Sequence, residues 1–461
     1  MDDASSPRAP GPLGRGYLEV TLSVLALVTI VAFESMAVST AMPTVARELD
    51  AVRSYGFAFS VMLTAQLLGI VLAGVWSDRS GPLVGAVTGQ ALLATGSAVC
   101  GFASTLPVFL AGRALTGLGG GLLVVMLYVI AGRFYPESIR PRLFTYVSAA
   151  WVLPSLLGAP VSAWLTTHLS WRWVFWGVVP PVLVTMAALA HARRRVDAAS
   201  LSVAVSGRDH AAHVRAAWAG VGIALAAGAV QVGTHELVLD LSPRTGLALA
   251  GLVGVVLVAP LLVPRGTWRM ARGLPSVMLS RALLTGAFYA GVTYVPLFLV
   301  GQRGLSLQTA GLSLAVGAVG WAAGAWYQGH DTLHLPRYRL VEIGGALLAA
   351  GFAVVAVVAG FGLPWWLVPL ALVLTGVAMG LGVTTTTVLS LELSPVEEHG
   401  EASSSLQLAD VLGSVLGIAA ATALFAARHV PGRDDALFAA IFLGLAAGAA
   451  VVVPAGQRIR T

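Results

Sequence analysis

The sequence predicts an all-α membrane protein, and its composition and the spacing of its apolar segments carry that prediction. Of the 461 residues, 57% are hydrophobic and only 10% are charged, and the mean hydropathy is +0.85. This composition is too apolar for a soluble domain of any size. Apolar segments of about 20 residues, each long enough to cross a hydrocarbon layer about 30 Å thick, recur along the whole length. The single cysteine, Cys100, excludes an internal disulfide framework.

Fourteen membrane spans are predicted from these apolar segments. Turn residues in the short connections indicate that neighbouring helices run antiparallel. The predicted spans lie at about 18–42, 55–76, 83–103, 106–132, 143–166, 173–191, 216–234, 245–264, 277–301, 308–328, 339–360, 365–391, 403–427 and 435–455.

The longest clearly polar connection follows the sixth span, with six predicted spans before it and eight after it. The last six spans form a block that resembles the first six, as in transporters built from paired repeats, whose substrate site lies between the repeats. The predicted organisation is a cytoplasmic N-terminal tail (1–16), an N-terminal six-helix bundle (17–191), a cytoplasmic linker (192–215), an inserted transmembrane hairpin and loop (216–273) and a C-terminal six-helix bundle (274–461).

Arginine distribution predicts how the chain lies in the membrane. Connections rich in arginine stay on the cytoplasmic side, and the arginines of this chain gather in the connections on the side of both termini. We therefore expect a multi-pass protein of the inner (plasma) membrane with both termini in the cytoplasm. The net charge of +6 and the pI of about 9.9 are then explained by insertion and by anionic headgroups, so a nucleic-acid partner is not required.

Glu34 is the only ionisable residue between Val20 and Met42, in the middle of the first span. Burying a carboxylate there costs several kcal/mol unless something compensates. A buried carboxylate that accepts a proton in one conformation and releases it when a cationic substrate arrives would couple the two ligands. The structural alternative is a hydrogen bond from the carboxyl group to a nearby hydroxyl, that of Ser35, Ser39 or Thr40.

Three further segments carry residues that point to function. "GVWSDRSGP" follows the second span and contains Gly74, Asp78, Arg79 and Gly81. It reads as a tight turn with an Asp/Arg pair at a helix terminus, and a plain capping turn is the alternative.

The second of these segments is "GRALTGLGGG" (112–121), in the fourth span, where Arg113 precedes a run of glycines. Small residues let helices approach closely in lipid, and an intramembrane arginine needs an acceptor or a wet cavity. An arginine tied only to backbone carbonyls is the alternative. In the fifth span, "WVLPSLLGAPVSAW" contains Pro154, Gly158 and Pro160, and we expect this helix to bend or to pack tightly.

These segments, together with the aromatic "WRWVFWGVVPP" (171–181), resemble the major facilitator superfamily, and more closely its fourteen-helix drug:proton antiporter branch. The resemblance covers nearly the whole chain. It implies two six-helix bundles with an inserted two-helix hairpin. Glu34, nine residues before Pro43, is similar to the carboxylate implicated in cation recognition and proton exchange, and Arg113 to the arginine of the coupling machinery. Asp78 and Arg79 resemble the cytoplasmic gate.

Asp410 departs from the family pattern. "ADVLGS" (409–414) stands where family members often carry an arginine. This carboxylate either faces Glu34 across the cavity or pairs with Arg113. Alternatively, it lies in a wet crevice or pairs with another donor.

The leading functional hypothesis is a proton-coupled exporter of lipophilic, cationic or zwitterionic small molecules such as drugs or secondary metabolites. An importer or a lipid or metabolite carrier of the same fold is the alternative. A membrane enzyme is disfavoured because the sequence has no metal-ligand spacing, no phosphate-binding loop and no nucleophile elbow. We expect a monomer in the lipid bilayer, with a small-molecule substrate, protons as coupling ion, and no metal or other cofactor. Candidate substrate contacts are the large side chains Tyr128, Trp151, Tyr289, Tyr294 and Gln407.

Overall fold

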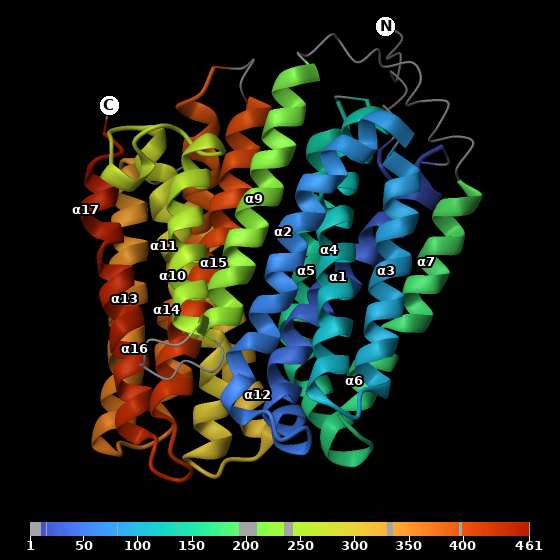
Figure 1. Cartoon of the computed structure of the whole chain (residues 1–461). Helices are drawn as coiled ribbons and strands as arrows, with labels where there is room; N and C mark the ends of the chain where they lie inside the picture. The colour runs from blue at the N-terminus through green and yellow to red at the C-terminus, as the bar shows by residue number, and fades with distance from the viewer. Residues whose placement is uncertain are drawn as a thin grey trace, which may run out of the picture.

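The computed structural model is a bundle of long, nearly parallel helices (Figure 1). It describes residues 11–14, 16–80, 82–136, 138–192, 210–234, 243–329, 335–395 and 399–460. Every regular element within these ranges is helical.

The N-terminal half contains the first six predicted spans. Its elements are α1 (Leu18–Glu48), η1 (Val52–Ser54), α2 (Tyr55–Ser80), α3 (Pro82–Phe102), α4 (Leu106–Phe134), α5 (Arg140–His168), α6 (Arg172–Trp176) and α7 (Val179–His191). The sixth span differs from the prediction because it is broken after Trp176. Pro180 and Pro181 stand in the first turn of α7, where the missing amide hydrogen costs nothing, so a new helix begins there.

The inserted hairpin and the C-terminal half follow. The hairpin consists of α9 (His210–Thr234) and α10 (Pro243–Val258), continued by η2 (Ala259–Leu261) and η3 (Thr267–Arg269). The C-terminal half consists of α11 (Leu274–Gly301), α12 (Leu307–Gln328), α13 (Arg337–Phe361), α14 (Leu367–Glu392), α15 (His399–Arg428), α16 (Asp435–Ala450) and α17 (Val452–Gln457).

Thirteen helical stretches of the described chain are long and apolar enough to cross a membrane. The remaining predicted span, 216–234, corresponds to α9, whose apolar part Trp218–Thr234 is shorter. The all-α membrane architecture expected from the composition is therefore confirmed. The predicted domain boundaries remain predictions.

The bundle has two distinct ends. The beginning of α1 and the end of the chain lie at one end, here called the terminal end (Figure 1). The end of α1, η1 and the beginning of α2 lie at the opposite end, here called the far end. The two halves touch through α5 against α12, α2 against α15, and α1 against α11 and α12.

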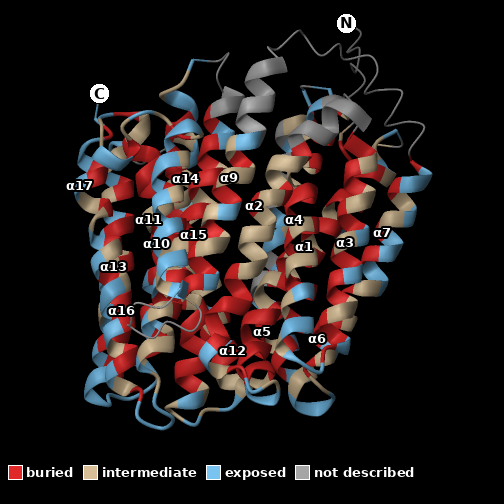
Figure 2. Ribbon diagram, in the orientation of Figure 1, coloured by how far each residue is buried: buried red, intermediate tan, exposed pale blue. Residues whose placement is uncertain are grey.

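The contacts between the halves are tight at the far end. A Cβ atom on Gly311 of α12 would lie 3.1 Å from both the Ala159 carbonyl oxygen and Thr40 Cγ2, in the other half. The rings of Tyr55 and Tyr294 lie 5.7 Å apart across the same boundary. Figure 2 shows buried residues concentrated where α5 and α12 meet at this end. The halves are therefore closed against each other at the far end.

The inserted hairpin lies along the junction of α2 and α15 (Figure 1). Gln231 of α9 donates to the Ser60 carbonyl oxygen over 2.9 Å and to Thr64 Oγ1 over 2.5 Å, both on α2. On the other side, Ser405 of α15 donates to the Leu262 carbonyl oxygen over 2.9 Å. The hairpin is therefore fastened to both halves.

Glycines of α4 allow it to pack directly on the backbone of α2. A Cβ atom on Gly117 would lie 2.0 Å from the Met62 carbonyl oxygen, closer than real atoms approach. Gly120, three residues later, has open space at the same position, with no atom within 4 Å. Close helix contact through small residues is the usual way that helices associate in lipid. Only part of the glycine run is therefore needed for packing.

We expect Gly117→Ala to destabilise the protein by about 1–3 kcal/mol, because the added methyl group overpacks the α2–α4 contact. Gly120→Ala is the matched control, and it should be neutral or stabilising by up to about 1 kcal/mol, since alanine is the better helix former. Thermal unfolding in detergent, followed by tryptophan fluorescence, measures both. Equal melting temperatures for the two variants would contradict the packing described here.

Candidate functional site

The buried carboxylate of the first span is paired with the arginine of the fourth span. Arg113 Nη1 lies 2.6 Å from Glu34 Oε1, and the side chains are 3% and 1% exposed. The same guanidinium group donates from Nε to the Ala58 carbonyl oxygen over 3.4 Å, and its Nη2 lies 2.7 Å from Met62 Sδ. Arg113 therefore connects α4 with both α1 and α2.

This geometry decides between the alternatives left open for Glu34 and Arg113. Ser39 donates to the Ser35 carbonyl oxygen over 3.3 Å, and the Thr40 hydroxyl has no hydrogen-bond partner in the described part of the chain. The two charges compensate each other, and removing one partner from such a buried pair typically costs about 3–5 kcal/mol. Their role in proton coupling stays a prediction.

Asp410 has a partner that the sequence analysis did not identify. Its Oδ2 atom lies 2.9 Å from Nη2 of Arg281 on α11, and the side chains are 22% and 8% exposed, respectively. It is paired with neither Glu34 nor Arg113, so the alternative of another donor is the one observed. Arg281 stands close to the beginning of α11, where a basic residue reads as a helix-end anchor. The rule used for Arg113, that an arginine inside a span needs an acceptor or a wet cavity, applies to Arg281 as well and would have identified it.

Close packing of α11 against α15 brings Arg281 and Asp410 together. A Cβ atom on Gly413 of α15 would lie 2.1 Å from the Ala282 carbonyl oxygen of α11. Thr285 of α11 also donates to the Asp410 carbonyl oxygen over 3.0 Å. The glycine one turn after Asp410 therefore sets the distance between the two charged side chains.

Three of the predicted cavity residues lie near this second pair. Tyr289 lies on α11 two turns after Arg281, and Tyr128 of α4, in the other half, lies within electrostatic reach of both charges. Tyr128 is 54% exposed and lies toward the terminal end of α4. Gln407 is half-buried, one turn before Asp410 on α15.

The other two predicted cavity residues lie elsewhere. Trp151 is on α5 and is 40% exposed. Tyr294 is fully buried at the far end, where its hydroxyl donates to Thr422 Oγ1 over 3.2 Å and its ring packs between those of Tyr55 and Phe425. In this conformation Tyr294 belongs to the closed contact between the halves, and its role as a substrate contact stays a prediction.

The predicted gate segment is only partly described. Gly74, Asp78 and Arg79 lie in the last turns of α2, where the structure describes the backbone alone. Gly81 lies outside the described residues. Helix α2 runs to Ser80 and α3 begins at Pro82, so Gly74, Asp78 and Arg79 belong to the helix, and the role of this segment as a gate stays a prediction.

The fifth-span segment packs tightly beside Glu34. Pro154 and Pro160 lie inside α5, which stays helical across both. A Cβ atom on Gly158 would lie 3.0 Å from Met36 Cβ of α1, and Ser162 donates to the Ala37 carbonyl oxygen over 2.6 Å. The tight packing expected for this segment is therefore observed.

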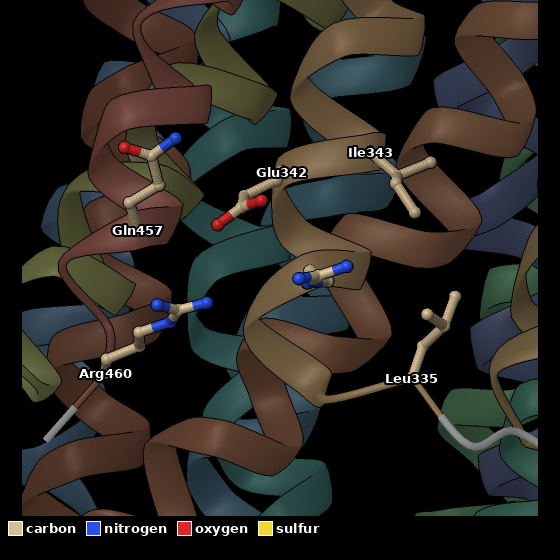
Figure 3. Close-up of a pocket in the computed structure, with 6 residues that line it drawn as sticks. Leu335, Glu342, Ile343, Gln457 and Arg460 are labelled. Carbon is tan, nitrogen blue, oxygen red and sulfur yellow. The ribbon is translucent and has the colours of Figure 1, made fainter.

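A surface pocket of about 460 Å³ lies apart from both ion pairs, at the terminal end between α13 and α17 (Figure 3). Its lining residues are Leu335, Arg339, Glu342, Ile343, Gln457 and Arg460. Among the described residues, no group of three or more histidine, cysteine or acidic side chains could hold a metal ion.

The sequence pattern of the Major Facilitator Superfamily matches residues 24–418. An uncharacterized MFS-type transporter of Mycobacterium tuberculosis is 27% identical over 436 residues, which cover 90% of this chain and 60% of that protein. The chain thus spans about three fifths of that relative's length. The multidrug transporter protein MdtP of Bacillus subtilis is 22% identical over 88% of this chain and 76% of its own length.

Solved structures share the fold at low sequence identity. A POT family transporter in complex with a thioalcohol-conjugated peptide has a TM-score of 0.73 and 13% identity, over 98% of this chain and 99% of that one. A D-xylose–proton symporter has a TM-score of 0.63 and 17% identity, over 95% of this chain and 98% of that one. The match over residues 24–418 and the shared fold lead to one conclusion: the chain belongs to the Major Facilitator Superfamily.

Proposed function

We propose that this chain is a proton-coupled exporter of lipophilic, cationic or zwitterionic small molecules, and that it works by alternating access. The observation that carries the proposal is the sealed Glu34–Arg113 pair between α1 and α4. Relatives named as multidrug transporters, among them MdtP and the multidrug efflux pump SdrM of Staphylococcus aureus, support the substrate class.

Proton coupling follows from what a proton does to this pair. Protonation of Glu34 removes its charge, so Arg113 loses its counter-ion and is left with the Ala58 carbonyl oxygen and Met62 Sδ of α2. The same helices carry the far-end contacts through Thr40 of α1 and Tyr55 of α2. Protonation therefore changes the contact that joins α1, α2 and α4, and with it the balance between closed and open far ends.

The direction of access rests on the arginine distribution, which assigns the terminal end to the cytoplasm. The far end, closed by the Tyr55–Tyr294 contact, then faces outward. In this conformation the half-exposed Tyr128 and the Arg281–Asp410 pair would be reached from the cytoplasm. Rocking of the two halves would then present the same groups to the outside.

Import by the same fold is the second candidate. The same fold is found in a POT family transporter and in a D-xylose–proton symporter. Because these proteins are under 20% identical to this chain, they carry no information on its direction of transport. Direction has to be measured.

We expect cells that express the chain to accumulate less of a cationic dye such as ethidium, and a protonophore to abolish the difference. Glu34→Gln removes the exchangeable proton, so it should abolish both the lowered accumulation and the proton release caused by substrate. Glu48→Gln on the same helix is the matched control, because Glu48 is 51% exposed and pairs with Arg172 at the far end. It should transport like the unmodified chain.

Higher dye accumulation in expressing cells would favour import. Full transport by Glu34→Gln, with the protein folded by thermal unfolding, would remove Glu34 from the coupling mechanism.

Alternating access also predicts a pattern of cysteine labelling. Cys100 is buried, and replacing it by alanine leaves a background without thiols. In that background, Tyr128→Cys should react rapidly with a polar maleimide, because Tyr128 is exposed, and Tyr294→Cys should be protected. Mass spectrometry of the purified protein over time measures both rates.

Substrate should raise the labelling of Tyr294→Cys and lower that of Tyr128→Cys, since opening the far end closes the other, and acidification, which competes with substrate in an exchanger, should oppose this change. Rates that do not respond to either ligand would argue against two alternating conformations.

A further inference from the structure

The two buried ion pairs differ in how they meet the surroundings. Glu34 and Arg113 are sealed, with 1% and 3% of their side chains exposed. Asp410 is 22% exposed, and Tyr128 of the opposite half, on which the Asp410 charge acts, is 54% exposed. The second pair is therefore the less enclosed of the two.

The second pair is also incompletely satisfied. Asp410 Oδ1 and Arg281 Nε are both buried and have no hydrogen-bond partner in the described part of the chain. A carboxylate has room for several donors, and a buried acceptor without one is costly. Among the described residues, no N–H group is donated to this oxygen of Asp410, so it can accept a hydrogen bond from a bound molecule.

Arg281 is held independently of Asp410. Its Nη1 atom donates to the Val383 carbonyl oxygen over 2.8 Å and to Thr387 Oγ1 over 3.2 Å, both on α14. Only Nη2 reaches Asp410. Because these bonds to α14 remain when the Asp410 bond is lost, another cation could replace Arg281 at Asp410 without leaving the guanidinium group unpartnered.

Two tyrosines lie within electrostatic reach of the carboxylate. Tyr289 lies on α11, two turns after Arg281, and Tyr128 lies on α4 in the other half. A cation between tyrosine faces gains about 0.5–2 kcal/mol, depending on how far it is desolvated. The surroundings of Asp410 therefore suit a cation carried on an aromatic body.

We propose that Asp410 binds the substrate cation as a protonated amine, and that Arg281 is a built-in competitor that sets the affinity for it. The amine donates N–H groups to Asp410 and displaces Arg281 Nη2, while α14 retains the guanidinium group. This inference rests on the proposed function in one respect, namely that the bound molecule is the transport substrate. It assigns substrate recognition to the second pair and leaves proton exchange with Glu34.

The test uses the purified full-length chain in nanodiscs and two fluorescent probes. One is propranolol, an aromatic protonated secondary amine, and the other is its quaternary N,N-dimethyl derivative, which has no N–H donor on nitrogen. Fluorescence anisotropy at constant pH gives the Kd of each. Propranolol should bind about tenfold more tightly than the quaternary probe, because a charge-assisted hydrogen bond of about 1.4 kcal/mol corresponds to a factor of ten.

Substitutions at the two charges should have opposite effects on propranolol. We expect Asp410→Asn to weaken binding about tenfold, because the charge of the acceptor is lost, and Arg281→Gln to tighten it about tenfold, because the competitor is gone. If the pair had only a structural role, both substitutions should change the Kd for propranolol in the same direction, since either one loosens the contact of α11 with α15. Glu342→Gln, in the surface pocket, is the control carboxylate and should leave the Kd unchanged.

Tyr128 supplies a variant that does not disturb a buried charge. Tyr128→Ala should weaken propranolol binding severalfold, and Tyr128→Phe should retain it. An unchanged Kd in Asp410→Asn, weaker binding in Arg281→Gln, equal binding of the two probes, or no binding of propranolol at all would each overturn the inference. If Asp410→Asn fails to fold, the directions in which Arg281→Gln and Tyr128→Ala change the Kd for propranolol still test the inference.

The two proposals fail separately. One possible result is that dye export and proton release depend on Glu34, whereas propranolol binding does not depend on Asp410. That result would overturn only this inference. Asp410-dependent binding in a chain that exports nothing would support this inference and overturn the proposed exporter function.

Discussion

The cost of a charge inside a helix bundle that crosses lipid determines how this protein is built. An unpaired carboxylate or guanidinium group loses its hydration there, so each such group needs a partner from another helix. Glu34 finds Arg113, and Asp410 finds Arg281. Each pair joins two helices within one half, so charge pairing adds to the packing that holds each half together.

The same rule leads to different outcomes in the two halves because the partners are held differently. Arg113 is enclosed among α1, α2 and α4, and its bonds all lie within the N-terminal half. Arg281 is anchored to α14 by bonds separate from the one to Asp410. A proton can change the first pair with no other ligand entering. In the second pair, Asp410 Oδ1 has no hydrogen-bond partner among the described residues, and the exposed Tyr128 of the opposite half lies within electrostatic reach.

Residue type and position in a span were enough to predict the groups that matter, but not their partners. Glu34 and Arg113 are conspicuous because a charge in an apolar run always requires compensation. Their pairing joins positions 79 residues apart, and nothing in the local sequence specifies that contact. Arg281 also lies inside the predicted span 277–301, but its pairing with Asp410 depends on the close approach of α11 and α15 at Gly413, which the local sequence does not specify. The break in the sixth span, by contrast, follows from Pro180 and Pro181, which the sequence displays.

Closure at the far end and the charge pairs involve the same helices, which is why they can be coupled. Helix α1 carries Glu34 in its middle and Thr40 two turns later at the contact with Gly311 of α12. Helix α2 carries the Ala58 carbonyl oxygen that accepts from Arg113, one turn after Tyr55, whose ring meets Tyr294. Since packed helices shift as rigid elements between discrete arrangements, a change at the Glu34–Arg113 pair reaches the boundary between the halves within two helical turns. Under the proposed mechanism, the short distance between the charge and the closed contact would let a proton on Glu34 bias the equilibrium between the two conformations.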